Sequence, residues 1–283
     1  MFDISVLMPY YNSESYLDRL FKSLLSQKVD NVQLIFVDDG SDDSSFAKVE
    51  SYKEILNPTW QLINIHNEHD CQASAISTGL KLIDSEIFTW IDSDDELLDG
   101  FLSARIDFFK ANKDYGMVRN NILEDNTLLG TDNKLLFEGD MAREVDDLFL
   151  GLFCGKYPTA GAGIYTIKTK NFFDIYTDKV IPVSKVGQNL QLILPPTSTE
   201  KCGYIDKTLY KYIRKPQSHS NSKRSIKEII DRINDISQLL YELIPYCNYD
   251  SEKLKEYVKS YKETETTNYL KKAALANIKK IKS

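Results

Sequence analysis

The chain of 283 residues contains few of the residues that build zinc sites and disulfide frameworks. It has four cysteines and three histidines, and its cysteines, at positions 71, 154, 202 and 247, are widely separated with no C-x-x-C pair. A zinc site would have to be assembled from distant parts of the chain. We therefore expect four reduced thiols and neither a disulfide scaffold nor a zinc module.

Long apolar runs are absent as well. No segment approaches the ~18–20 apolar residues that cross a bilayer. The first residues, MFDIS, lack the basic region and cleavage site of a signal peptide. Hydrophobic residues make up 42% and charged residues 27%, an ordinary globular composition. We expect a soluble, cytoplasmic protein.

An excess of positive charge is also missing. The chain has 35 basic and 42 acidic side chains, a net charge of −7, which argues against a nucleic-acid partner. The charge is unevenly distributed along the chain. Residues 223–283 contain 13 basic and 9 acidic side chains, whereas the residues before them contain 22 basic and 33 acidic ones. An acidic body is therefore followed by a basic C-terminal extension.

The first hundred residues alternate between short apolar runs and amphipathic segments. The pattern predicts strands at 4–8, 34–37, 60–65 and 87–91, and helices near 16–25, 45–55, 73–83 and 101–110. Such repeated units form parallel sheets with helices on both faces, and ligands bind beyond the carboxyl ends of the strands. The fold class is therefore α/β.

The later residues follow a less regular pattern. We expect an apolar helix near 145–153, a strand pair over 202–213 and a helix over 225–243. Pro245 breaks the last pattern, and a more charged helix begins near residue 251.

Polar clusters follow three of the predicted strands: PYYN at 9–12, DD at 38–39 and DSDD at 92–95. Carboxylates this close raise each other's pKa unless a cation neutralises them. Mg²⁺ and Mn²⁺ bind such oxygen ligands and often share them with substrate phosphates. The alternative for the last cluster is an acidic turn that caps a helix beginning at residues 96–97.

Three segments together resemble the inverting glycosyltransferases of family 2. They are SVLMPYYN at 5–12, FVDDGSDD at 36–43 and IDSDD, the family's D-x-D motif, at 91–95. The resemblance implies the GT-A fold, a Rossmann-like, mostly parallel sheet with helices on both faces. It divides the chain into a GT-A domain over 1–222, with a nucleotide-binding half (1–100) and an acceptor-side half (101–222), and a helical extension over 223–283.

The resemblance also implies roles for individual residues. Tyr11 would stack on uracil and Asp39 would accept the N–H of the base. The implied nucleotide-sugar-binding residues are Pro9, Tyr11, Asn12, Asp38, Asp39, Asp92 and Ser93. Asp94, with Asp95 beside it, would be catalytic and would hold the Mn²⁺ or Mg²⁺ that stabilises the departing diphosphate.

The sequence departs from the family pattern in the segment 67–80. Ile76 stands where many members have arginine. The segment is closer to a subgroup with GQSDAINKG, which it matches at Gln72, Ala75, Ile76 and Gly79, while Cys71 and Ser74 replace the first glycine and the aspartate. Two interpretations stay open, a phosphate-contacting segment and a plain packing helix.

A second departure concerns the general base, which inverting transfer needs to accept the acceptor's proton. Gln188 and Asn189 occupy the position of the family's G-E-D carboxylates, and neither amide can act as a base. Asp174, Glu124 and Asp125 are alternative carboxylates. An inactive enzyme is the remaining alternative.

The segment YKYIR at 210–214 with SHS at 218–220 resembles a late loop of the family. It implies that His219 completes the metal site or contacts the diphosphate, and a solvated histidine is the alternative. Arg214, Lys215 and Lys223 are candidates for phosphate contacts or for simple solvent exposure.

These observations predict metal-dependent transfer of a sugar from a nucleotide-diphospho-sugar, with UDP favoured, to a saccharide or lipid-linked acceptor in polysaccharide synthesis. The alternatives are a degenerate nucleotide-sugar-binding protein and a nucleotidyltransferase, though the Gly-rich basic loop of the latter is missing. The C-terminal helices would pack on the catalytic domain, contact the inner face of the membrane or form a homodimer.

Overall fold

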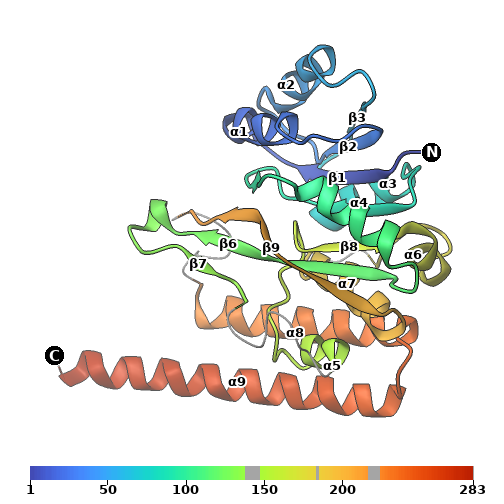
Figure 1. Cartoon of the computed structure of the whole chain (residues 1–283). Coiled ribbons are helices and arrows are strands. Elements are labelled where there is room, and N and C mark those ends of the chain that lie inside the picture. Colours follow the sequence, from blue (N-terminus) through green and yellow to red (C-terminus); the bar gives the residue numbers. More distant parts are fainter. Residues whose placement is uncertain (138–146, 183–184, 216–223, 283) are drawn as a thin grey trace.

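The computed structural model describes residues 1–137, 147–182, 185–215 and 224–282, with side chains placed up to residue 271. The sheet has the order β3-β2-β1-β4-β8-β6-β9-β5, and β7 pairs with β6 (Figure 1). Its strands are β1 (Ile4–Tyr10), β2 (Val32–Asp38), β3 (Gln61–His66), β4 (Ile87–Trp90), β5 (Glu96–Leu97), β6 (Met117–Asp125), β7 (Lys134–Leu135), β8 (Tyr165–Lys168) and β9 (Cys202–Ile213). The helices are α1 (Glu14–Leu25), α2 (Ser45–Ser51), α3 (Gln72–Leu80), α4 (Phe101–Ala111), α5 (Leu148–Phe153), α6 (Thr169–Ile175), α7 (Gln188–Thr199), α8 (Ile226–Leu243) and α9 (Ser251–Lys282), with short 3₁₀ turns at Tyr52–Glu54, Thr127–Leu129 and Ile244–Tyr246.

The N-terminal half is a parallel sheet, as the alternating pattern predicts. β1 pairs in parallel with β2 and β4, and β2 pairs in parallel with β3. Successive side chains of a strand point to opposite faces. The ring of Phe21 in α1 stacks on Phe36, whereas Gly79 in α3 lies against Ile35 and Val37. Helices therefore cover both faces of the sheet.

The C-terminal half adds a mixed set of strands. β8 is antiparallel to β4 and β6, and β9 runs parallel to β6 and antiparallel to β5. The predicted strand pair over 202–213 is wrong, because β9 is one 12-residue strand that finds its partners elsewhere in the chain. The helix start at residues 96–97 is wrong as well, since these residues form β5 against Lys211 and Tyr210.

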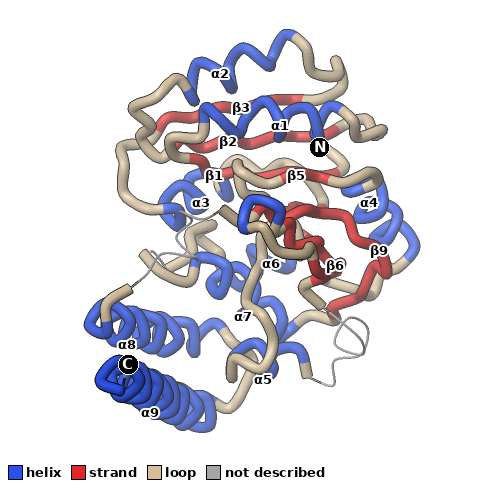
Figure 2. Tube along the Cα trace, turned by 90° about the vertical axis from the view of Figure 1, so that its left-hand side faces the viewer, coloured by secondary structure: helices blue, strands red, loops and turns tan. Residues whose placement is uncertain are grey.

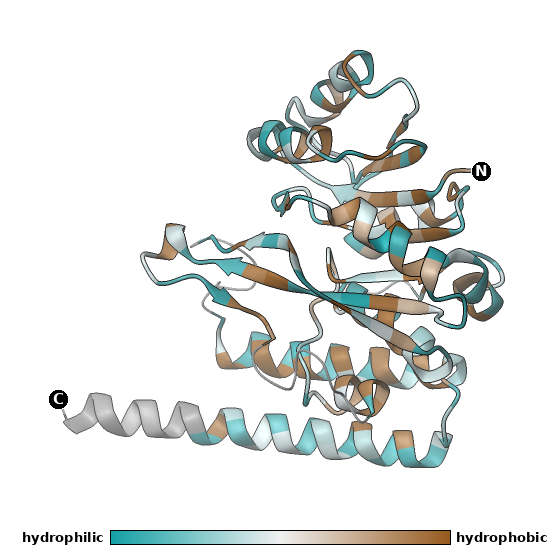
Figure 3. Ribbon diagram, in the orientation of Figure 1, coloured by the Kyte–Doolittle hydropathy of each residue, from teal (hydrophilic) through white to brown (hydrophobic). Residues whose placement is uncertain are grey.

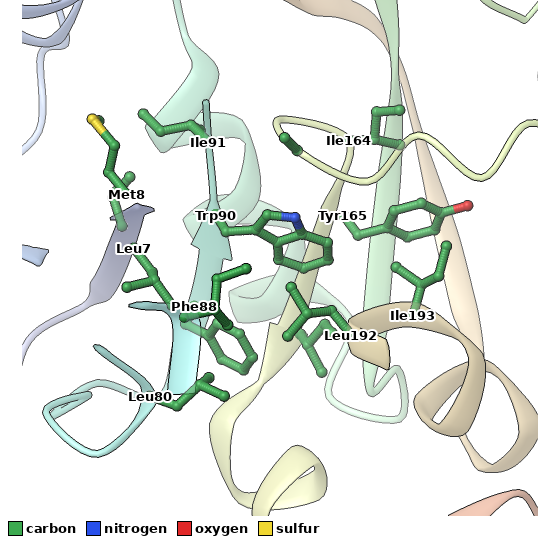
Figure 4. Packing of buried hydrophobic residues seen from close by; sticks show 14 of the residues in the cluster. Leu7, Met8, Leu80, Phe88, Trp90, Ile91, Ile164, Tyr165, Leu192 and Ile193 are labelled. Atoms are coloured by element: carbon green, nitrogen blue, oxygen red, sulfur yellow. The ribbon is translucent and has the colours of Figure 1, made fainter. Parts of the chain in front are cut away.

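The core runs through both halves of the molecule. Figure 4 shows Leu7 and Phe88 of the parallel strands near Trp90, with Leu192 and Ile193 of α7 on its other side. All five side chains are buried and belong to one apolar cluster. The strands that carry the polar clusters are therefore fixed by the same core as the C-terminal half.

The C-terminal helices lie side by side on the far side of α7 from β1–β3 (Figures 1 and 2). The apolar stripe of α8 is buried at Leu239, Leu240 and Leu243, and a methyl group added at Gly187, next to α7, would lie 2.7 Å from Leu239. The exposed length of α9 is mostly hydrophilic (Figure 3). Among the described residues, none of the helices combines the length and apolar character that a membrane span requires.

Candidate active site

A cavity of about 1370 Å³ lies at the carboxyl ends of β1, β2 and β4. Its lining includes Pro9 and Tyr11 at the end of β1, Asp39 after β2, and Asp92 and Asp94 after β4. Residues from the C-terminal half line it as well, among them the start of α7 and part of α8. The convergence expected from the three strand ends is thus present in the structure.

The two carboxylates after β2 have different surroundings. Asp38 is fully buried and accepts hydrogen bonds from the Ser41 backbone at 3.0 Å and from the ring of His66 at 2.8 Å. Asp39 lines the cavity, where it accepts a bond from the Asp70 backbone at 3.2 Å and lies 3.1 Å from Nδ1 of His69. Asp38 therefore shapes the turn, and Asp39 is the carboxylate of this pair that lines the cavity.

Tyr11 presents an aromatic surface at the same end of the cavity. Its side chain is 46% exposed, and its ring stacks on His69 with 4.4 Å between centroids. The predicted neighbour Asn12 does not line the cavity among the described residues; its side-chain oxygen accepts from the Asp42 backbone at 3.0 Å. Asn12 thus braces the loop that carries Tyr11.

The D-x-D segment presents two carboxylates to the cavity. Asp92 accepts a hydrogen bond from Nε2 of Gln72 at 3.1 Å, and burial together with the nearby Asp94 raises the pKa of Asp92 to about 7. Between these two aspartates in the sequence, the hydroxyl groups of Ser93 and Ser13 form a hydrogen bond of 2.7 Å. The segment is therefore tied to both α1 and α3.

Asp94 is paired with a cation of the chain itself. Nζ of Lys215 lies 2.6 Å from its carboxylate and 3.4 Å from the centroid of the Tyr16 ring. Arg19 donates to the backbone carbonyl of Asp94. An ammonium group thus stands against the carboxylate that was expected to hold a divalent metal.

Asp95 points away from the cavity, which corrects its predicted catalytic role. Its side chain is 1% exposed and accepts a hydrogen bond from the Ile213 backbone at 2.9 Å. Burial and the neighbouring Asp94 and Asp92 raise the pKa of Asp95 well above its usual range. The residue anchors the end of β9 beneath the site.

The chemistry of the donors suits a hard divalent cation in part. Asp92 and Asp94 offer carboxylate oxygens, and the pKa of Asp92 is raised by burial first and by the nearby Asp94 second, so a cation would favour its charged form. Within the described part of the chain, no three His, Cys, Asp or Glu side chains are grouped closely enough to hold a metal ion. A metal at this site would therefore take further ligands from the substrate or from elsewhere, and would share Asp94 with Lys215. His219 and Lys223 lie outside the described residues.

The amides at the expected base position have separate roles. Gln188 lines the cavity, whereas Oδ1 of Asn189 accepts a hydrogen bond of 3.0 Å from the indole N–H of Trp90. Trp90 is 1% exposed, so this bond satisfies a buried donor. Asn189 thus helps to hold the end of β4 in place.

The alternative carboxylates do not line the cavity among the described residues. Asp174 pairs with Lys170, and Asp125 accepts from the Thr127 backbone at 3.0 Å. Glu124 lies 3.2 Å from Lys134 and 3.8 Å from Arg214. The acidic side chains that do line the cavity are Asp39, Asp70, Asp92 and Asp94.

The segment 67–80 lies partly at the cavity and partly in the core, and its predicted phosphate contacts stay a prediction. The side-chain amide of Gln72 donates a hydrogen bond to Asp92 in the cavity. Ile76 is buried, and a methyl group added at Gly79 would lie 2.1 Å from the side chain of Leu7. The start of α3 therefore belongs to the site, and the rest of the helix packs on the sheet.

Several residues of the site were not assigned a role from the sequence, although Tyr210 belongs to the YKYIR segment. Tyr210 accepts a hydrogen bond from the Asp92 backbone at 3.0 Å, and Arg19 and Ser13 hold the D-x-D segment from α1. Arg224 and Arg232 line the cavity from the C-terminal extension. Only the three-dimensional fold brings these residues to the strand ends.

A mixed sheet, parallel over β1–β4, with an acidic D-x-D segment at the carboxyl ends of these strands, defines a GT-A nucleotide-diphospho-sugar transferase fold. Solved structures support this class: the chain superposes on residues 1–349 of TarS from Staphylococcus aureus in complex with UDP-GlcNAc with a TM-score of 0.66, at 18% identity, covering 91% of this chain and 71% of that one. It superposes on the mannosyltransferase PcManGT from Pyrobaculum calidifontis, in complex with GDP-Man and Mn²⁺, with a TM-score of 0.61, at 14% identity, covering 97% and 75%. The predicted fold class is confirmed.

The family follows from the sequence comparison. The model of glycosyl transferase family 2 matches residues 5–151, so the chain belongs to this family, as its motifs predicted. The minor teichoic acid biosynthesis protein GgaA of Bacillus subtilis is 34% identical over 113 residues. That match covers 37% of this chain and 24% of GgaA, so the chain spans only part of this relative.

Proposed function

We propose that the protein transfers a sugar from a nucleotide-diphospho-sugar, with UDP as the favoured nucleotide, to a saccharide acceptor in the synthesis of a surface polysaccharide, with inversion at the anomeric carbon. Family membership supports the reaction class. The match to GgaA and the likeness to the UDP-GlcNAc complex of TarS support the polymer class and the nucleotide.

One observation carries this proposal: the cavity joins two kinds of ligand contact. Tyr11 and Asp39 offer an aromatic face and a carboxylate acceptor for a base, and Asp92, Asp94 and Lys215 lie at the neighbouring strand end. A base, a diphosphate and a sugar are the parts of a donor that such an arrangement suits.

In the proposed reaction, the acceptor's hydroxyl oxygen forms a bond to the anomeric carbon while the bond from that carbon to the β-phosphate oxygen breaks. The nucleoside diphosphate leaves with the bonding electron pair, and the acceptor's proton passes to water or to a carboxylate of the cavity wall. Lys215 neutralises charge beside the leaving group. A divalent cation, when bound at Asp92 and Asp94, would supply further charge neutralisation.

Calorimetry with UDP, in Mn²⁺, in Mg²⁺ and in EDTA, tests the donor site, and a screen of UDP-sugars for UDP release tests the reaction. We expect Asp94→Asn to lower UDP release by about 10²-fold or more. Asp174→Asn, on the exposed surface of α6, is the matched control and should retain the activity. If UDP does not bind and Asp94→Asn changes nothing, the proposal fails.

The degenerate binding protein remains the second candidate, because both residues at the expected base position are amides and Asn189 is engaged with Trp90. It predicts UDP binding without release of UDP from any UDP-sugar in the presence of any acceptor. Observed turnover would exclude it.

A further inference from the structure

The two side chains proposed to bind the base are both in contact with a third residue, His69. This residue lies in the segment between β3 and α3 and lines the same cavity. Its ring stacks on that of Tyr11 with 4.4 Å between centroids and an angle of 21° between the planes. Its Nδ1 lies 2.9 Å from the backbone oxygen of Asp39 and 3.1 Å from the carboxylate Oδ2 of the same residue. His69 therefore joins the aromatic face and the carboxylate of the expected base site.

Three neighbouring strands bring these residues together. Tyr10, Asp38 and His66 are register partners at the ends of β1, β2 and β3. The backbone N–H of Asp39 donates to the Tyr10 carbonyl at 2.8 Å, and the backbone N–H of Asn67 donates to the Asp38 carbonyl at 2.8 Å. The segments that leave the three strands are therefore joined to one another, and they place the side chain at position 69 beside its two partners.

The close approach of His69 to the turn after β2 depends on a glycine. Gly40 has a φ of +75°, in the left-handed region that favours glycine, and a Cβ added to it would lie 2.6 Å from the backbone nitrogen of His69. A residue with a side chain at this position would push the His69 segment away from Asp39. The glycine that follows the two aspartates thus makes room for His69.

The contacts of Asp39 fix the direction of its carboxylate. Rotation about the bond to a carboxylate group is weakly restricted, so the orientation of the group depends on its hydrogen bonds. Oδ1 accepts from the Asp70 backbone at 3.2 Å, and Oδ2 faces Nδ1 of His69. A backbone carbonyl can only accept, so Nδ1 carries the hydrogen in this arrangement. Each carboxylate oxygen has two lone pairs, which leaves one for the N–H of a base.

The stack on His69 holds the other part of the base site. The Tyr11 side chain is 46% exposed, and an exposed aromatic side chain loses conformational freedom when it stacks on a base. A ring that is already stacked on a neighbour loses less of this freedom. The contact with His69 therefore lowers the cost of base binding at Tyr11.

We propose that His69 is a positioning residue for the nucleotide, which holds the Tyr11 ring for stacking and the Asp39 carboxylate for the N–H at N3 of uracil, and thereby sets a preference for uracil over cytosine. Cytosine differs at this edge, because its N3 carries a lone pair that would face the Asp39 carboxylate. A site built to bond an N–H rejects an analogue that lacks it. This inference rests on the proposed transferase function with UDP as the nucleotide.

Two substitutions separate the two contacts of His69. His69→Phe keeps a ring that can stack on Tyr11 but removes the donor to Asp39, whereas His69→Asn keeps an amide donor and removes the ring. Calorimetry of the full chain with UDP and with CDP, in the same Mg²⁺ buffer, measures both affinities. We expect the unchanged protein to prefer UDP by about tenfold or more, the difference made by a hydrogen bond to a charged group. His69→Phe should reduce this preference by about threefold or more, and His69→Asn should keep it within about twofold while weakening both nucleotides by about threefold or more.

Glu68→Ala is the matched control, because Glu68 is exposed in the same segment and does not line the cavity among the described residues. This variant should bind UDP and CDP as the unchanged protein does. Thermal denaturation followed by circular dichroism checks that each variant is folded.

The outcomes separate this inference from the proposed function. Failure of UDP to bind the unchanged protein would refute the donor site itself. If UDP binds without a preference over CDP, or if His69→Phe leaves the preference unchanged, the positioning role of His69 is refuted and the transferase function stands. If His69→Phe and His69→Asn weaken UDP and CDP by the same factor, His69 only supports its segment and the inference fails.

Discussion

Tyr11 is the residue at which the nucleotide hypothesis can be tested most directly. Its half-exposed ring stacks on His69 in the structure, and a base would stack on the same aromatic surface. Base–aromatic stacking contributes about 1–3 kcal/mol, so we expect Tyr11→Ala to raise the Kd for UDP by about five- to a hundredfold. Calorimetry measures the change. Tyr257→Ala, on α9 and 38% exposed, is the control and should bind UDP normally. Equal affinities of the two variants would contradict a base site at Tyr11.

Asn189 shows that a residue at a family's base position can have a structural role. Asn189→Ala leaves the buried indole N–H of Trp90 without its acceptor, and we expect the free energy of unfolding to fall by about 1–3 kcal/mol. Asn189→Asp keeps an acceptor oxygen and should lose less. Denaturant titrations of both variants measure this difference. An Asn189→Ala variant as stable as the unchanged protein would show that the bond contributes nothing.

At the scale of single residues, the sequence predicts where the cavity lies, but it does not predict which carboxylates face it. Asp39, Asp92 and Asp94 line it, whereas Asp38 and Asp95 are buried in hydrogen bonds of the scaffold. Asp38 and Asp39 are consecutive at the end of an extended strand, where neighbouring side chains point to opposite sides. Residues 93–94 form a turn, and Asp95 after it is directed into the scaffold. A motif gives the positions of such residues, and the fold decides their directions.

Among the elements, α8 carries an apolar stripe and one cation of the cavity, Arg232, and its start is fixed by a capping box. The side chain of Ser225 accepts from the Glu228 backbone at 3.2 Å, and Glu228 accepts from the Ser225 backbone at 2.7 Å. We expect Ser225→Ala to lower the free energy of unfolding by about 0.5–2 kcal/mol. Ser225→Asp, which keeps a capping oxygen, is the control and should retain most of the stability in thermal denaturation. Equal losses in both variants would assign the effect to something other than the cap.

The elements themselves were predictable where pairing is local. Apolar runs separated by amphipathic segments define β1–β4 and their helices. The crossovers from β1 to β2 and from β2 to β3 join neighbouring strands, and the next one returns the chain to the other side of β1, where β4 pairs. β9 was mistaken for a strand pair because its alternation says nothing of its partners, β6 and β5, which lie about ninety or more residues earlier in the chain. The same long-range pairing brings Tyr210 and Lys215 to the site.

At the scale of the whole molecule, the sequence predicts a GT-A domain that ends at residue 222 and a helical extension after it. The structure shows how this extension contacts the rest of the chain. The extension contacts the body through Leu239 against Gly187, through the ring of Tyr246 tilted against that of Tyr176 with 4.9 Å between centroids, and through the Asn248 backbone, which donates to the Ser198 hydroxyl at 2.9 Å. These contacts are apolar for the most part, so the opposite charges of the two regions are not what joins them. The extension completes the core and the cavity together.

We therefore expect the chain to unfold as one cooperative unit, and a chain truncated after residue 222 to lose its cooperative transition. Leu243 is fully buried, and Leu243→Ala should lower the free energy of unfolding by about 2–5 kcal/mol. Leu270→Ala, on a side chain that is 47% exposed, should change it by less than about 0.5 kcal/mol. Scanning calorimetry of the full chain, the truncated chain and both variants measures these effects. A truncated chain that still unfolds in one sharp transition at the original temperature would instead make residues 1–222 an independent domain, and the C-terminal extension an addition to an already complete fold.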